Sequence, residues 1–269
     1  MFLRKAGRIV FHLFAFLMVV YFTLPMIIAV MMSFTPTRFL RLPTTEWSLQ
    51  WYVAFFDDPK WIEGLWNSMI VASITIVISM IVGLTAALAF SRYKFKWNTT
   101  LYTLALTPVF TPAVIIAMSL LAVAYKTGMW GGYVIIAIAH SLWAFPLVIM
   151  VLRVSLEGLD RSLEEAARGM GATPLRVFYE IILPLIAPSI LVGALFAFII
   201  SINEFIMALF LGTSQTETLP RIIYPTLRYR LTPLVASASG ILMLLTVAVL
   251  LLAARLMNLR KLISFNRSN

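Results

Sequence analysis

The sequence contains no cysteine and little charge. Only 12% of its 269 residues are charged, and two are histidine. The lack of cysteine excludes disulfide bonds and thiolate metal sites. His12 and His140 lie far apart in apolar runs, and we expect both to be packing or interface residues. The patterns HExxH, GxSxG and GxxxxGK[ST] are missing as well, which leaves no recognisable catalytic constellation or phosphate-binding loop. We therefore expect a protein that is not an enzyme and that binds no cofactor or metal itself.

Apolar residues dominate what is present. They make up 61% of the chain, and the mean hydropathy is +0.95, which is more apolar surface than a soluble domain buries. A helix needs about 20 apolar residues to cross the ~30 Å hydrocarbon core of a bilayer. Six stretches are long enough, at about 9–33, 65–90, 100–125, 130–152, 184–211 and 235–254. The sequence thus predicts an all-α integral membrane protein with six transmembrane helices, forming a single domain over 1–269.

Lysine and arginine are distributed unequally among the segments that connect these stretches. The alternate set that includes both termini contains fourteen of them, and the other set contains seven. Since cytoplasmic loops are enriched in these residues, we expect both termini to be cytoplasmic. The first stretch follows Arg4, Lys5 and Arg8 but is too long for a signal-peptide core, so we expect an uncleaved helix. The net charge of +10 then indicates orientation and contact with anionic membrane lipid, not nucleic-acid binding.

Aromatic residues gather in or beside the two longest outward segments, 34–64 and 212–234. Two compatible interpretations are an interfacial aromatic belt and a docking surface for a partner outside the membrane. The residues concerned are Trp47, Trp51, Tyr52, Trp61, Trp66, Tyr224 and Tyr229.

A polar insertion over 153–183 separates the fourth and fifth apolar stretches. Ser162 and Glu165 have the spacing of a capping box, which predicts a short helix that ends at the glycines of 169–171. Thr173 is a suitable N-cap with Pro174 at the first helical position, which predicts a second short helix through Ile182. The insertion is therefore expected to form two small amphipathic helices joined by a glycine turn.

The same insertion carries a recognisable motif. Its fixed residues all occur at the spacing of the EAA motif, and they are Glu165, Ala166, Ala167, Gly171, Ile181, Leu183 and Pro184. In this respect the chain resembles the permease subunits of binding-protein-dependent ABC importers with the type I fold. The resemblance implies that residues 155–183 form a cytoplasmic coupling loop that seats on a separate ATPase subunit. Small alanines allow close approach, and Glu165 offers a carboxylate to a cation on the partner. The alternative is that Glu165 only caps its own helix.

The resemblance also implies an assembly in a bacterial inner membrane. Its expected members are two ABC ATPase subunits that bind ATP and Mg²⁺, a second and related permease subunit, and a periplasmic or lipid-anchored solute-binding protein. Asn67-Ser68, Thr107-Pro108 and the segment 201–204 look like the spermidine/putrescine-type branch. A polyamine-like substrate is favoured, with a phosphonate, iron or another small solute as alternatives. That branch often has two adjacent acidic residues where this chain has Asn203-Glu204, which weakens the inference to a dicationic substrate.

Glu204 is the only formal charge within the six stretches. A charge inside a membrane costs about 2.5–3.5 kcal/mol on insertion scales and usually faces a cavity or a partner group. Ser201, Glu204 and Ala208 would share one face of a continuous helix, and we expect them, with Asn203, to line a pathway or gate. The alternative is a structural hydrogen bond or a neutral buried carboxyl group. A secondary transporter would need a denser set of intramembrane charges or paired broken helices.

Overall fold

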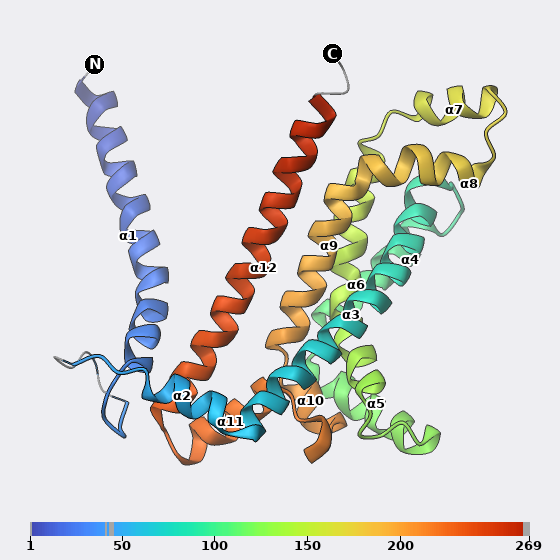
Figure 1. Cartoon of the computed structure of the whole chain (residues 1–269). Helices are drawn as coiled ribbons and strands as arrows, with labels where there is room; N and C mark the ends of the chain where they lie inside the picture. The colour runs from blue at the N-terminus through green and yellow to red at the C-terminus, as the bar shows by residue number, and fades with distance from the viewer. Residues whose placement is uncertain (1, 41, 43–45, 266–269) are drawn as a thin grey trace. The chain divides into compact units, whose positions relative to one another are not determined.

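The computed structural model describes residues 2–40, 42 and 46–265, and the side chains of 11–40, 42 and 46–257. Arg41 and Arg267, which count toward the predicted orientation, lie outside the described residues. All regular elements within the described part are helices (Figure 1). In chain order they are α1 Phe2–Ser33, α2 Gln50–Asp57, α3 Pro59–Arg92, α4 Asn98–Leu106, the 3₁₀ turn η1 Thr107–Phe110, α5 Ala113–Thr127, α6 Tyr133–Glu157, α7 Arg161–Gly169, α8 Pro174–Val177, the π-turn η2 Phe178–Ile182, α9 Leu183–Asn203, α10 Ile206–Leu211, the 3₁₀ turn η3 Ser214–Thr216, α11 Leu219–Tyr229 and α12 Pro233–Phe265.

Five helices in the described residues are long and apolar enough to cross a membrane, and a bent pair raises the number to six. The five run over Phe11–Ser33, Pro59–Arg92, Tyr133–Glu157, Pro174–Asn203 and Pro233–Met257. This confirms the predicted helical membrane fold.

The third predicted stretch, 100–125, is not one straight helix. Asn98–Phe110 and Ala113–Thr127 meet at 99°. Thr111 between them is extended, with φ −86° and ψ 129°, because a residue that precedes proline is disfavoured in the helical region and Pro112 follows. The expectation of an uninterrupted span was wrong at this point.

The fifth predicted stretch, 184–211, is also interrupted. Helix α9 ends at Asn203, Glu204 is extended with φ −79° and ψ 126°, and α10 begins at Ile206. Ser201, Glu204 and Ala208 therefore do not lie along one continuous helical face, which corrects the expectation drawn from their spacing.

The chain divides into two compact units, Met1–Ile62 with Ile223–Leu244, and Glu63–Ile222 with Leu245–Asn269. The prediction of a single permease domain over 1–269 stays a prediction. In the first unit, Ser237 Oγ donates to the carbonyl oxygen of Trp51 at 3.1 Å, and Tyr52 Oη lies 2.8 Å from Ser33 Oγ. Trp61 is buried beside Phe55. Trp51, Tyr52 and Trp61 therefore pack within the protein. Of the others in the predicted belt or docking surface, Trp47, Trp66, Tyr224 and Tyr229 are exposed.

The second unit packs around α6. One apolar core joins α6 to α3, α5 and α10, and another joins it to α3, α7 and α9. Two glycines allow the close approach of neighbouring helices. A Cβ atom on Gly83 of α3 would lie 2.5 Å from Cγ1 of Val148, and one on Gly193 of α9 would lie 3.4 Å from the same atom. Small residues at such crossings are typical of membrane helix packing.

Candidate functional site

The first helix of the polar insertion, α7, starts two residues earlier than the predicted cap at Ser162 indicates. Asp160 is the N-cap, and its Oδ1 accepts a hydrogen bond from Ser162 N at 2.9 Å. Hydrogen bonds from the backbone and the side chain of Ser162 lower the pKa of the Asp160 carboxyl group. The predicted capping box between Ser162 and Glu165 was therefore wrong, because the true cap lies two residues before Ser162.

The glycine turn and the second helix follow the prediction. Gly171 has φ +85°, in the left-handed region that favours glycine. Ala172 N donates to the carbonyl oxygen of Ala167 at 3.0 Å, which closes the C-terminus of α7. Thr173 Oγ1 accepts a hydrogen bond from Arg176 N at 3.3 Å, and Pro174 is the first helical residue.

The second helix does not stop at Ile182. It passes from α8 through the π-turn η2 into α9, as the orange ribbon in Figure 1 shows. Leu183 N donates to the carbonyl oxygen of Phe178, five residues earlier. Pro184 has no N–H, and its ring crowds the carbonyl group four residues before it. The wider turn relieves this conflict. The second helix of the polar insertion and α9 therefore form one continuous helix.

The motif residues divide between an exposed and a buried side of this loop. Glu165, Ala166 and Gly171 are exposed, whereas Ala167 is buried in the core beside α6. Toward α9, Ile181 and Leu183 are half-buried, and Pro184 is exposed. Glu165 is therefore not buried within this chain, and its predicted contact with a partner stays a prediction.

An ion pair that the sequence did not suggest holds α7 to the end of α3. Arg92 Nη2 lies 2.6 Å from Glu164 Oε1, and both side chains are almost buried. Arg92 Nη1 also donates to the carbonyl oxygen of Leu156 at 2.8 Å, and Arg161 Nη2 donates to that of Ser91 at 2.8 Å. Glu164 lies three residues before Ala167 and so on the same face of α7, but only the structure shows that this face is buried.

Arg92, Arg161 and Glu164 also line a cavity of about 340 Å³. Its wall further includes Glu165 and Phe178. Polar and apolar side chains of this kind suit contact with another protein surface.

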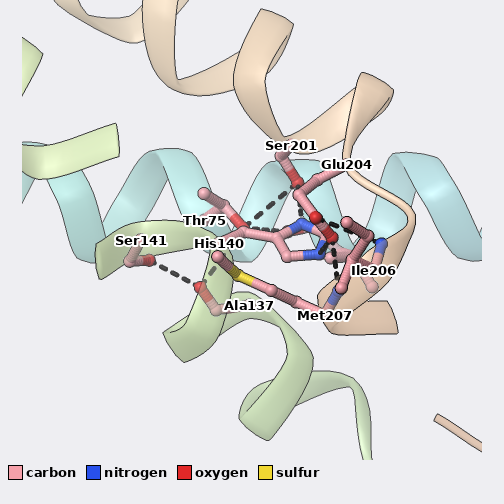
Figure 2. Close-up of polar contacts among 9 residues, drawn as sticks. Thr75, Ala137, His140, Ser141, Ser201, Glu204, Ile206 and Met207 are labelled. Carbon is pink, nitrogen blue, oxygen red and sulfur yellow. Dashed lines mark hydrogen bonds and ion pairs between the residues drawn. The ribbon is translucent and has the colours of Figure 1, made fainter. Parts of the chain in front are cut away.

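A second polar group lies inside the membrane-spanning region, where α9 is interrupted (Figure 2). Glu204 Oε1 accepts a hydrogen bond from Ile206 N at 3.1 Å, and Oε2 accepts one from Met207 N at 2.8 Å. The carboxylate thus caps the first turn of α10, where backbone carbonyl partners are missing. This capping explains how a helix can stop within an apolar segment.

His140 of α6 lies against the interruption between α9 and α10. Its Nδ1 lies 2.9 Å from Ser201 Oγ, and its Nε2 lies 3.5 Å from Glu204 Oε2. Ser201 Oγ in turn donates to Thr75 Oγ1 of α3 at 3.3 Å. All four side chains are buried, and Figure 2 shows them converging from three helices and the interruption.

The structure therefore brings together two of the four residues predicted for a pathway or gate. Ser201 and Glu204 meet at His140, whereas Asn203 is exposed and donates to the carbonyl oxygen of Ile199 at 2.8 Å. Ala208 is buried in the core formed with α5 and α6. His140 was expected only to pack or form an interface, and its polar contacts were not predicted. Across the described residues, no group of three His, Cys, Asp or Glu side chains could hold a metal ion.

Comparison with known proteins adds three kinds of likeness. A model of the family described as "Binding-protein-dependent transport system inner membrane component" matches residues 79–262. The putrescine transport system permease protein PotI of Escherichia coli (strain K12) is 32% identical over 86% of this chain and 83% of its own length. The spermidine/putrescine transport system permease protein PotC of Haemophilus influenzae is 29% identical over 89% of this chain and 93% of its own length.

Solved structures share the fold at lower identity. A bacterial ABC transporter involved in the import of the acidic polysaccharide alginate contains a chain with a TM-score of 0.70 and 17% identity. The match covers 94% of this chain and 96% of that one. The MetNI methionine ABC transporter, in an inward-facing conformation, gives a TM-score of 0.63 at 18% identity, over 78% of this chain and 97% of that one.

Proposed function

Because the chain belongs to the family of binding-protein-dependent transport system inner membrane components, we propose that it forms half of a pathway importing polyamine-like organic cations. It is a permease subunit of an ABC importer and not an enzyme. The observation that carries the substrate proposal is the match to putrescine and spermidine permeases over most of the chain. Glu204, an acidic side chain in the membrane-spanning region, suits a cationic solute.

The proposed assembly contains two ATPase subunits, a second and related permease, and a periplasmic or lipid-anchored binding protein. ATP and Mg²⁺ would bind on the ATPase subunits. Exposed Glu165 and the turn at Gly171 are the features that would seat in each ATPase. Movement of this loop would reach α9 directly, because α8, η2 and α9 are continuous. Alternating access would then expose the pathway to each side of the membrane in turn.

The orientation of the chain can be tested with single cysteines, since the sequence has none of its own. Ser162 in α7 and Ser214 in η3 are both exposed. With cytoplasmic termini, a membrane-impermeant thiol reagent should label Ser214→Cys in cells with a permeabilised outer membrane, and should label Ser162→Cys only after lysis. Labelling of Ser162→Cys alone in unlysed cells would invert the proposed orientation.

The proposed role of Glu204 predicts a selective loss of uptake. In liposomes that contain the whole complex and its binding protein, Glu204→Gln should lower putrescine uptake about 10- to 100-fold, the scale of one charged hydrogen bond of about 1.5–3 kcal/mol. Assembly should persist, because the amide can still accept a hydrogen bond. Glu204→Asp keeps the charge and should lose less. Wild-type uptake by both Glu204→Gln and Glu204→Ala would remove the residue from the pathway. If wild-type complex takes up no polyamine but accumulates another solute, the substrate proposal fails while the family assignment stands.

A further inference from the structure

Hydrogen bonds link Thr75, Ser201 and His140 in the cluster drawn in Figure 2. Thr75 Oγ1 donates to the carbonyl oxygen of Val71 at 2.8 Å, so its single proton is used. Ser201 Oγ donates to Thr75 Oγ1 at 3.3 Å, which uses the single proton of that hydroxyl group. With the hydroxyl protons placed in this way, Nδ1 of His140 is the donor at the next contact, which is 2.9 Å long.

This direction leaves the other nitrogen of His140 without a proton. A neutral imidazole carries one N–H, and here it is on Nδ1. The bare Nε2 is buried without a hydrogen-bond partner, 3.5 Å from Oε2 of Glu204. An ionised carboxylate is only an acceptor, so two lone pairs would face each other in a site shielded from water. Buried polar atoms that cannot pair are unfavourable.

One additional proton resolves the conflict, whichever of the two groups carries it. We infer that His140 and Glu204 bind one proton between them, and that this proton holds the interruption between α9 and α10 against α6. We call this arrangement the latched state. Without the proton, Glu204 keeps its contacts to the amides of Ile206 and Met207 but is repelled by Nε2. The interruption can then separate from α6.

The hydrogen bonds and ion pair that the structure gives for His140, Ser201 and Glu204 involve no further ionisable side chain among the described residues. The elements packed on this pair present Thr75 from α3, Ser201 from α9 and Met207 from α10, and none of these titrates in the physiological range. Histidine does. Proton binding by this pair would therefore regulate the site of the proposed function. The inference rests on the proposed function only in the experiment that measures uptake.

The test follows thermal melting of the assembled complex from pH 5.5 to 8.5 in nanodiscs. Bound protons stabilise the latched state, so the melting temperature of the wild-type complex should fall as the pH rises. The pH dependence of other subunits cancels when variants are compared in the same complex. Glu204→Gln should lose the dependence that the pair contributes, because an amide group in place of the carboxylate does not bind the additional proton.

Two further variants complete the design. His140→Leu should lose the same dependence while staying at the lower melting temperature, and His12→Gln, which removes the only other histidine, should retain the wild-type profile. A wild-type slope in Glu204→Gln overturns the inference, even if His140→Leu does not assemble. It would mean that Ser201 donates to Nδ1 and that no extra proton is bound. Failure of the polyamine proposal would leave these melting profiles unchanged.

Uptake provides a second readout through its ratio between two pH values. Release of a single proton changes the unlatched fraction by no more than about tenfold per pH unit. Between two pH values, the rate of wild-type uptake should change within this limit. The uptake rate of Glu204→Gln should lack the change that the pair contributes, whatever its absolute value. A ratio equal to that of the wild type in Glu204→Gln contradicts the latch.

Discussion

Glu165→Lys is expected to release the ATPase subunits or to disconnect their hydrolysis from uptake, while the chain still inserts and folds. Glu165 is exposed on α7, and its side chain takes no part in the N-cap, which is Asp160. Loss of one partner of a hydrogen-bonded charge pair at an interface costs about 2–5 kcal/mol, or roughly 30-fold or more in ATPase affinity. The measurement is co-purification of the ATPase, together with solute imported per ATP hydrolysed. Glu165→Gln should be milder, because it retains an acceptor oxygen.

The turn at Gly171 supplies a second arm for this prediction. A Cβ atom there would meet nothing within 4 Å, but φ is +85°, so a substitution acts through the backbone alone. Gly171→Val should impair coupling, whereas Gly171→Asn should be tolerated better, since asparagine enters the left-handed region more readily. Gly169→Ala is the matched control, because Gly169 has equal space and lies within α7. Normal coupling in both Glu165→Lys and Gly171→Val would refute the assignment of the loop.

Removal of either partner of the Arg92–Glu164 pair is expected to destabilise the complex strongly. The two side chains are only 12% and 11% exposed, and an uncompensated buried charge costs about 3–5 kcal/mol. Glu164→Ala should therefore lower the melting temperature of the complex by several degrees and loosen α7 from the end of α3. The double variant Arg92→Met with Glu164→Leu should recover much of the loss, because a buried pair can often be replaced by apolar side chains.

An exposed ion pair in the same loop serves as the control. Arg176 Nε lies 3.0 Å from Glu180 Oε2, with both side chains more than half exposed, at 65% and 60%. Helical surface pairs of this spacing contribute about 0.3–0.5 kcal/mol, so Arg176→Ala should melt close to the wild type. Equal effects of Arg176→Ala and Glu164→Ala would show that burial does not set the importance of the Arg92–Glu164 pair.

Composition was sufficient to predict the helical membrane fold, because a run of about 20 apolar residues has few other stable arrangements. The exact course of the spans was harder to predict. The bend near Pro112 had a visible signal that span length alone obscured. The interruption at Glu204 had none, since neither glycine nor proline occurs between Gly193 and Gly212. It depends on a side-chain carboxylate that caps α10.

Local chemistry in the polar insertion over 153–183 was predicted in part. Thr173, Pro174 and Gly171 act through their own backbone, so sequence is enough to recognise them. Glu164 required knowledge of which face of α7 meets the core. His140 required more, because its partner Ser201 is 61 residues away along the chain, and only tertiary packing brings them together.

The π-turn at Phe178–Ile182 also sets how far α9 is rotated about its axis relative to α8. A π-turn holds about one residue more than an α-helical turn, and one residue corresponds to about 100° of rotation around an α-helix with 3.6 residues per turn. All of α9 beyond Leu183 is therefore turned by about that angle relative to α8. Without this offset, Ser201 would face about 100° away from His140. The turn that accommodates Pro184 thereby sets how the buried cluster at one end of α9 is rotated relative to the polar insertion at its other end.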